Sequence, residues 1–181
     1  MQYEDILGQK EIKKQLQQTI AENRVSHAQL FLGPEGSGAL PMALAYATEI
    51  LCTNTNKNKR ASFLKCQKLA HPDLHLVFPT NTTTAVKKNA IYKAFQAEFR
   101  EAVFENPYLS LNQWLDHLGI GNKQGSINVA SSQEIIRDIS LKPFESDYKV
   151  VIFWMVEKLH PSASNKLLKI LEEPPAKTTF I

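Results

Sequence analysis

A glycine-rich turn between an apolar run and a helix-forming run constrains the fold more than any other feature of the sequence. The turn lies within residues 28–40, where Gly33 is followed, after four residues, by Gly38. This is the layout of a phosphate-binding loop that joins a strand to a helix. The motif continues with Lys and then Ser or Thr, whereas this chain has Ala39 and Leu40. The loop therefore has the backbone pattern of a nucleotide site without the side chains that contact phosphate and magnesium.

We interpret residues 33–40 as a degenerate phosphate loop that is kept for its shape. Its members are Gly33, Pro34, Glu35, Gly36, Ser37, Gly38, Ala39 and Leu40. The glycines allow a tight turn and close packing, and neither ATP hydrolysis nor bound ATP or magnesium is expected. Weak binding of phosphate or sulfate by the backbone N–H groups stays open.

The end of the most apolar run, residues 148–155, is a second test of nucleotide chemistry. P-loop nucleoside triphosphatases place Asp-Glu at the end of such a strand, for the metal and the attacking water. Trp154 and Met155 stand there in this chain, and we interpret the later Glu157 and Lys158 as solvated loop residues. The Lys of the phosphate loop and the Asp-Glu pair at the end of the strand are both missing. A single unusual substitution is therefore a poor explanation for the departure from the motif. No catalytic residue is predicted.

Alternating strand-like and helix-like segments predict a three-layer α/β domain around a parallel sheet. Strands are expected over residues 30–32, 74–78, 148–155 and 178–181. Helices are expected over residues 9–23, 40–51, 131–141 and 162–172. Ile12, Leu16 and Ile20 share one face of the first helix, and a capping box of Ser131 and Glu134 opens the third. The run 148–155 is expected to be a central strand that is buried on both faces.

The segment of residues 80–125 interrupts this alternation, and we interpret it as a helical insertion. Its apolar residues form two helical faces, Ile91, Phe95, Phe99 and Val103 in one and Leu111, Trp114, Leu115 and Leu118 in the other. Gly119 and Gly121 are expected to end the second helix. The aromatic residues Phe95, Phe99 and Phe104 fit a core better than a base-stacking platform. In contrast, the polar residues 53–60 are expected to form a loop.

Composition and cysteine content restrict the class of protein. The 181 residues suit one domain, and a net charge of +3 permits contact with nucleic acid without indicating it. No apolar run reaches 18 residues, and the start of the chain lacks the basic and apolar regions of a signal peptide. Two cysteines do not make a disulfide framework. A reducing, cytoplasmic compartment is expected.

Cys52, Cys66, His71 and His75 are the candidate metal ligands of the chain. Structural zinc sites use closely spaced Cys-x-x-Cys pairs, which are absent. We therefore expect no metal, with Cys66 packed as a small apolar side chain and His71 hydrogen-bonded within a turn.

Seven short blocks of the sequence resemble the clamp-loader subunits of bacterial DNA polymerase III. The blocks are residues 5–9 (DILGQ), 26–28 (SHA), 33–38 (GPEGSG), 71–74 (HPDL), 140–144 (SLKPF), 148–152 (YKVVI) and 165–175 (NKLLKILEEPP). The last block is the most specific. The blocks span nearly the whole chain except residues 80–125. The delta-prime type, whose phosphate loop is commonly degenerate, is the most similar, because the gamma/tau type keeps the Lys-Thr and Asp-Glu that are missing here.

The resemblance implies an AAA+ (P-loop NTPase, RecA-like) domain, with the lid and collar domains and an arginine-bearing sensor segment beyond Ile181. It implies a non-catalytic subunit that works with gamma/tau and delta to load the sliding clamp onto primer-template DNA, as part of a nucleotidyltransferase holoenzyme. The family carries a four-cysteine zinc module, of which Cys52 and Cys66 would be remnants, so zinc is not expected. The helix near residue 162 would lie toward DNA, where Lys166 and Lys169 would contact phosphate.

Two other functions stay open at this point. One is an active, nucleotide-dependent AAA+ ATPase of the gamma/tau type that uses a non-standard phosphate site. The other is a stand-alone interaction scaffold built on an inactive nucleotide fold, which needs no polymerase partner.

Overall fold

A computed structural model of the chain describes residues 1–55, 58–120 and 123–181. At its centre lies a parallel sheet in the order β1 (Leu74–Val77), β2 (Lys149–Phe153) and β3 (Thr178–Phe180). Leu74 pairs with Val150, which in turn pairs with Thr179. The central strand β2 is buried along its length except at its last residue. The predicted parallel sheet with residues 148–155 at its centre is confirmed.

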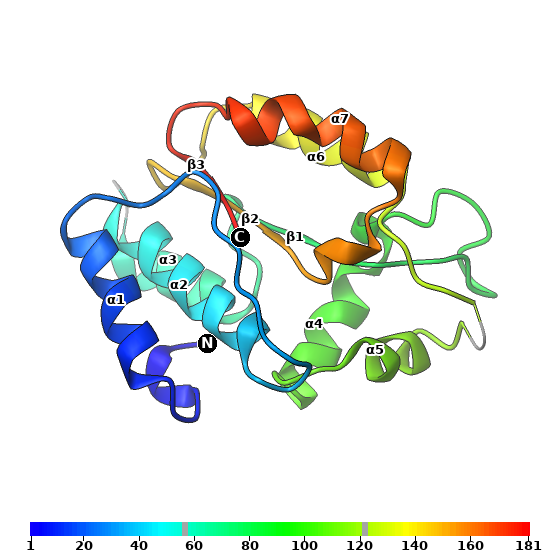
Figure 1. The fold of residues 1–181 in the computed structure, drawn as a ribbon, viewed down its shortest axis with the longest axis horizontal. Coiled ribbons are helices and arrows are strands. Elements are labelled where there is room, and N and C mark those ends of the chain that lie inside the picture. The colour runs from blue at the N-terminus through cyan, green and yellow to red at the C-terminus, as the bar shows by residue number, and fades with distance from the viewer. Residues whose placement is uncertain (56–57, 121–122) are drawn as a thin grey trace.

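Helices cover both faces of this sheet (Figure 1). They are α1 (Lys10–Ala21), α2 (Ala39–Thr53), α3 (Lys59–Gln67), α4 (Gln96–Glu105), α5 (Leu111–His117), α6 (Val129–Ser140) and α7 (Pro161–Glu172), with short 3-10 turns η1 (Tyr3–Asp5), η2 (Tyr92–Phe95) and η3 (Val156–Lys158). The pair α6 and α7 forms one outer layer, and α1, α2 and α3 form the other. The predicted three-layer α/β class is therefore confirmed. Within the described ranges, no helix has both the length and the apolar content that a membrane span requires.

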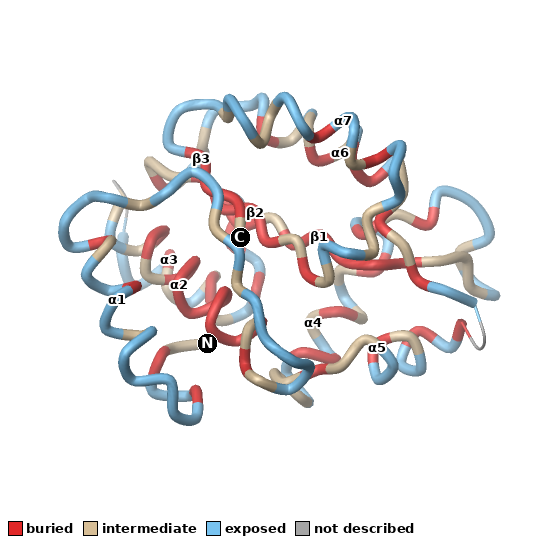
Figure 2. Tube along the Cα trace, viewed as in Figure 1, coloured by how far each residue is buried: buried red, intermediate tan, exposed pale blue. Residues whose placement is uncertain are grey.

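The helix α2 is the core helix of the domain. It is rich in apolar residues. It is buried over most of its length, as Figure 2 shows. Pro41 fits its first turn, where no backbone N–H is needed for an intrahelical bond. In α1, Leu16 and Ile20 are buried, but Ile12 is 45% exposed. Ile12 was predicted on the buried face of this helix, and that prediction was wrong. The hydrogen bond between Thr19 of α1 and Tyr46 of α2 lies in the second half of α1, where the buried residues are.

One predicted strand and two predicted boundaries were wrong. Residues 30–32 form no strand; the chain just before them forms an isolated bridge with β3, between Ala28 and Phe180. The helix α6 begins at Val129, and the side chain of Asn128, not Ser131, caps it by accepting the N–H of Ser131. Both ends of the predicted loop 53–60 are helical, because α2 extends to Thr53 and α3 begins at Lys59; residues 56–57 lie outside the described residues. Gly121 lies outside the described residues.

An aromatic cluster packs the 80–125 segment against the sheet. The rings of Phe78 and Phe99 stack with centroids 3.9 Å apart, and the Trp114 ring meets each of them edge-on at 5.2 Å. The indole N–H of Trp114 donates to the carbonyl of Pro79 at 2.7 Å. Phe95 and Phe99 are core residues as predicted, whereas Phe104 is 56% exposed. Thr80 and Ser126 close the segment with reciprocal backbone hydrogen bonds of 3.0 and 3.1 Å.

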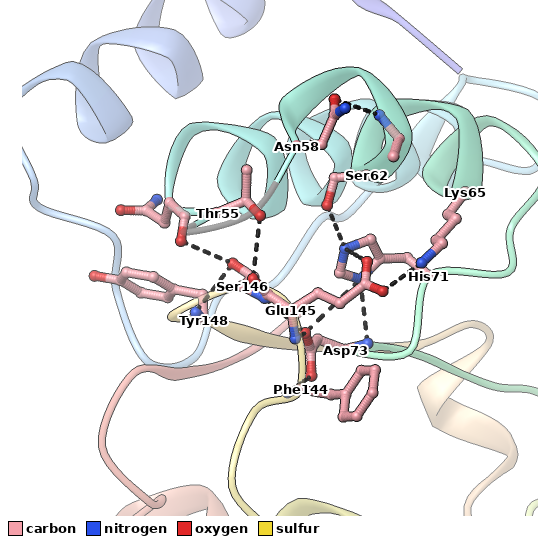
Figure 3. A network of polar contacts seen from close by, with 12 residues as sticks. Thr55, Asn58, Ser62, Lys65, His71, Asp73, Phe144, Glu145, Ser146 and Tyr148 are labelled. Atoms are coloured by element: carbon pink, nitrogen blue, oxygen red, sulfur yellow. Dashed lines mark hydrogen bonds and ion pairs between the residues drawn. The ribbon is translucent and has the colours of Figure 1, made fainter.

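The carboxylate of Asp73 fixes the loop that leads into β2 (Figure 3). It accepts the backbone N–H groups of Phe144, Glu145 and Ser146 at 2.6–2.8 Å. The side chain of Asp73 is buried, and its own residue immediately precedes β1. One carboxylate therefore ties the entry of β1 to the entry of its neighbour β2.

A buried lysine caps the end of α6. The ammonium of Lys149 donates to the carbonyls of Asp138, Ile139 and Leu141. The last carbonyls of a helix have no intrahelical partner and carry partial negative charge, so a cation there is stabilising. Burial nevertheless lowers the pKa of the Lys149 ammonium.

Candidate functional site

A cavity of about 720 Å³ lies at the carboxyl end of β2. Its walls are residues 28–36 and 38–41, residues 107–109, residues 152–157 with Leu159, and apolar side chains of α7 and β3. Ligands of open α/β sheets bind at the carboxyl ends of the strands. The structure thus brings the 33–40 loop together with Trp154 and Met155, as expected for a P-loop architecture.

The backbone of the loop depends on its glycines. Gly38 adopts φ +94°, in the left-handed region, and caps the start of α2. A Cβ added there would also lie 3.2 Å from Cε1 of Tyr108. At Gly33, an added Cβ would collide with the hydroxyl of Ser37. The left-handed backbone at Gly38, and also at Gly36 with φ +77°, favours glycine, whereas a side chain at Gly33 would require Ser37 to move.

The backbone N–H groups at the start of α2 are arranged in a way that favours an anion. Ser37 uses its N–H internally, on the carbonyl of Pro34 at 3.0 Å. Among the described residues, no protein acceptor is found for the N–H groups of Gly38, Ala39 or Leu40. Free N–H groups at a helix N-terminus favour a negative charge.

The side chains around the cavity have the opposite preference. Glu35 and Glu157 are the charged residues of the described cavity wall, and both are acidic. Glu35 also accepts the N–H of Leu111 at 3.4 Å, which holds its carboxylate beside α5. The side chain of Leu40, where the motif has a hydroxyl, is buried in the core. A bound triphosphate would meet two carboxylates and no lysine, so the residues present do not fit ATP with magnesium.

Trp154 and Met155 directly follow β2 and line the cavity. The Trp154 ring is buried and packs against Phe99 with centroids 5.5 Å apart. Met155 adopts φ +57°, a conformation that is uncommon for a residue other than glycine. Glu157 is exposed in η3, as predicted for a solvated residue.

Lys166 and Lys169 lie outside the cavity. Both are exposed on α7, while Leu167 of the same helix is buried and lines the cavity. The structure therefore separates the two lysines from the 33–40 loop, and no described acidic side chain forms an ion pair with either.

Cys52 and Cys66 are free thiols in contact with each other. A hydrogen bond from Cys66 lowers the pKa of the Cys52 thiol, and the same contact together with burial raises the pKa of Cys66. No group of three or more His, Cys, Asp and Glu side chains in the described ranges is arranged to hold a metal. Two thiols alone do not complete a tetrahedral zinc site.

His71 forms a hydrogen-bonded group with Ser62 and Asp73 that sequence spacing could not reveal (Figure 3). The Ser62 hydroxyl lies 2.9 Å from Nε2 of His71, and Nδ1 lies 4.0 Å from the Asp73 carboxylate. This resembles a catalytic triad, but Nδ1 accepts the backbone N–H of Asp73 at 3.1 Å and so carries no proton for the carboxylate. All three side chains are buried, and burial lowers the pKa of His71. The group is structural, and the predicted hydrogen bond of His71 within the turn is confirmed.

His75 stands apart from this group. Its Nδ1 lies 3.8 Å from the carboxylate of Asp138, which also accepts hydrogen bonds from Tyr92 and Lys93. Burial lowers the pKa of His75 despite the nearby carboxylate.

A family model and individual relatives agree on the family to which the chain is similar. Residues 8–181 match the model of the family described as "DNA polymerase III, delta subunit". The chain is 29% identical over 176 residues to the DNA polymerase III subunit delta' of Bacillus subtilis, covering 96% of this chain and 40% of the relative. It is also 29% identical over 189 residues to the subunit tau of the same organism, covering 99% of this chain and 25% of the relative. A subunit tau/gamma of Haemophilus influenzae is 23% identical over 179 residues, with 99% of this chain and 20% of the relative covered.

The chain thus spans 40% or less of the length of these relatives. The matched family extends over nearly the whole sequence, includes the 33–40 loop and the residues after it, and agrees with the three-layer α/β fold. The chain belongs to the DNA polymerase III delta-subunit family, of the clamp-loader type.

Proposed function

We propose that the chain is the N-terminal AAA+ domain of a delta-prime-like, non-catalytic clamp-loader subunit. The observation that carries the proposal is the cavity wall, where Glu35 and Glu157 supply acidic charge and no described lysine or arginine contributes. Trp154 fills the core at the position where an acidic pair would hold a metal ion and its attacking water. The family relationship supports a clamp loader, and these side chains support an inactive member of it.

The proposal includes the partners and the compartment. The subunit works with gamma/tau and delta, and through the complex with the sliding clamp and primer-template DNA, in the cytoplasm. The names of the relatives support the polymerase partners. No ATP, magnesium or zinc is required by this chain, and Cys52 and Cys66 are remnants of a zinc module. Residues 80–125 are an insertion in the domain.

Titration of the full-length protein with ATP and magnesium tests the inactive site. We expect no magnesium-dependent binding in the micromolar range by calorimetry and no steady release of phosphate. No lysine or arginine of the described cavity wall offsets the charge of a triphosphate, and the free N–H groups at the start of α2 support only weak binding of inorganic phosphate. The tau-type subunit of the same organism is the positive control. Micromolar, magnesium-dependent binding of ATP would refute the proposal.

Lys166 and Lys169 are proposed to contact DNA phosphate in the assembled loader. In a Lys166→Ala variant, the slope of log affinity for primed DNA against log salt concentration should fall by about one, because one fewer counterion is released. Lys14→Ala is the matched control, since Lys14 is also exposed but lies on α1, in the opposite helical layer. An equal slope for both variants and the unmodified protein would show that the α7 lysines are only solvated.

An active AAA+ ATPase of the gamma/tau type is the second candidate function. The subunit tau of Bacillus subtilis is as identical to this chain, at 29%, as the subunit delta' is. This equal identity supports the gamma/tau type as an alternative. Steady phosphate release from the full-length protein would select it. A stand-alone scaffold is distinguished by the absence of co-purification with gamma/tau and delta.

A further inference from the structure

The sequence has two cysteines, and the fold places their side chains together. Cys52 stands near the end of α2 and Cys66 near the end of α3, and these two helices pack against each other (Figure 1). Both thiols are free, and they share a hydrogen bond. Thiols that already touch are the ones that a disulfide can join with little movement of the backbone.

The two thiols differ in their access to solvent. Cys66 is fully buried. Cys52 is half-buried and lines a pocket of about 350 Å³ that lies between α2, α3 and residues 1–4. A small oxidant can therefore reach the sulfur of Cys52, whereas the sulfur of Cys66 is in contact with Cys52 and away from solvent.

The same pocket contains buried polar atoms that lack full hydrogen bonding. The Tyr3 hydroxyl lies near the Glu49 carboxylate, and both residues line the pocket beside Cys52. Within the described chain, neither the Tyr3 hydroxyl nor Oε2 of Glu49 makes a hydrogen bond of normal geometry. Buried polar groups are usually hydrogen-bonded, so these two atoms favour a small polar molecule in the pocket. Hydrogen peroxide, which both donates and accepts hydrogen bonds, has this chemistry.

The surroundings of the two thiols favour thiol chemistry over a structural metal. Among the described residues, no third His, Cys, Asp or Glu side chain joins them in a group that could hold a metal ion. Two thiols alone do not complete a tetrahedral zinc site. In a reducing compartment, disulfides are usually transient and serve catalysis or redox sensing. A contacting pair with one accessible member is the arrangement that such a transient disulfide needs.

We propose that Cys52 and Cys66 are a peroxide-sensitive thiol pair, in which Cys52 reacts first and Cys66 resolves it to a reversible disulfide. This inference does not depend on the proposed function, because it needs only these two side chains and hydrogen peroxide.

The proposed reaction has two steps. The sulfur of Cys52, as the thiolate, attacks one oxygen of hydrogen peroxide, and the O–O bond breaks. Cys52 becomes a sulfenic acid, and the hydroxide that leaves takes up the proton lost by the thiol. The sulfur of Cys66 then attacks the sulfenic sulfur, the S–O bond breaks, and water leaves with the Cys66 proton. Two thiols are thereby oxidised to one disulfide, and one peroxide is reduced to two waters. Glutathione or a protein dithiol restores both thiols by exchange.

Treatment of the reduced full-length protein with one equivalent of hydrogen peroxide tests the pair. After free thiols are blocked, peptide mass spectrometry should find the Cys52 peptide linked to the Cys66 peptide, and dithiothreitol should separate them. The same treatment in concentrated urea is the control, and it should give less of this linkage because the contact between the thiols is lost.

Two serine variants test the order of the steps. In Cys66→Ser, dimedone should trap Cys52 as the sulfenic acid, since no resolving thiol is present. In Cys52→Ser, oxidation of Cys66 should be slower by about tenfold or more, because the buried thiol is out of reach of the oxidant. Equal oxidation rates of Cys66 with and without Cys52 would overturn the proposed order. Unchanged thermal unfolding midpoints of the reduced variants show that the substitutions leave the fold intact.

The peptide analysis of the unmodified protein decides the proposal without any variant. Both thiols remaining free under peroxide that oxidises glutathione would overturn it. A disulfide between two protein molecules, seen as a dimer on a non-reducing gel, would also overturn it. Release of zinc during the loss of thiols, measured by elemental analysis, would assign Cys52 and Cys66 to a metal site instead.

Discussion

Replacing Asp73 by alanine is expected to destabilise the full-length protein by about 3–5 kcal/mol, measured as the free energy of unfolding in urea. The carboxylate of Asp73 accepts three backbone N–H groups at 2.6–2.8 Å in a buried setting. Alanine would leave all three donors without an acceptor, and each buried, unsatisfied donor costs about 1–3 kcal/mol when water cannot reach it. Partial entry of water keeps the expected total below the sum of the largest values.

Two further variants make the Asp73 prediction specific. Asp73→Asn keeps one acceptor oxygen and should cost less than alanine, about 1–3 kcal/mol. Asp116→Ala removes an exposed aspartate of α5 and should change the free energy of unfolding by no more than about 0.5 kcal/mol. A loss for Asp73→Ala as small as that of Asp116→Ala would show that the Asp73 contacts do not hold the loop.

Replacing Trp114 by alanine is expected to destabilise the protein by about 3–5 kcal/mol. The Trp114 ring is fully buried between Phe78 and Phe99, and its N–H satisfies the carbonyl of Pro79. Truncation would leave a cavity in the aromatic cluster and a buried carbonyl without a donor. Urea unfolding followed by circular dichroism measures the effect without depending on tryptophan fluorescence.

The Trp114→Phe variant separates packing from hydrogen bonding. Phenylalanine keeps an aromatic ring in the cluster but loses the N–H and part of the volume, so its cost should be intermediate, about 1–3 kcal/mol. Equal losses for alanine and phenylalanine would assign the whole effect to the hydrogen bond with Pro79. No loss for alanine would mean that residues 80–125 do not share the core of the domain.

Much of the architecture could be predicted because local patterns agree with the tertiary contacts. The apolar run 148–155 contains the central strand β2, and the alanine-rich run after the glycine turn forms the core helix α2. Predictions failed where a distant contact overrides a local pattern. Residues 30–32 look like a strand, yet the isolated bridge to β3 lies before them, at Ala28. Ser131 and Glu134 have capping-box spacing, yet Asn128 caps α6 and Glu134 pairs with Lys93.

The candidate site was predictable in its location and not in its surroundings. The glycine spacing and the end of the apolar run identify the residues that meet at the cavity, because the carboxyl ends of parallel strands share one edge of a sheet. The acidic character of the cavity depends on Glu35 and Glu157, which are far apart in the sequence and line one cavity only in the folded chain. The contacts of Asp73 join it to residues that lie 71 to 73 positions further along the chain, so no local sequence pattern predicts them.

The bridge between Thr80 and Ser126 has a consequence for how this domain tolerates change in length. Because reciprocal hydrogen bonds hold the two ends of the 80–125 segment together, residues added between α4 and α5 or after α5 leave the strands where they are. The entropy lost on closing such a loop grows only with the logarithm of its length, about 0.6 kcal/mol for each doubling. A change of length in this segment therefore leaves the sheet and the cavity in their relative positions.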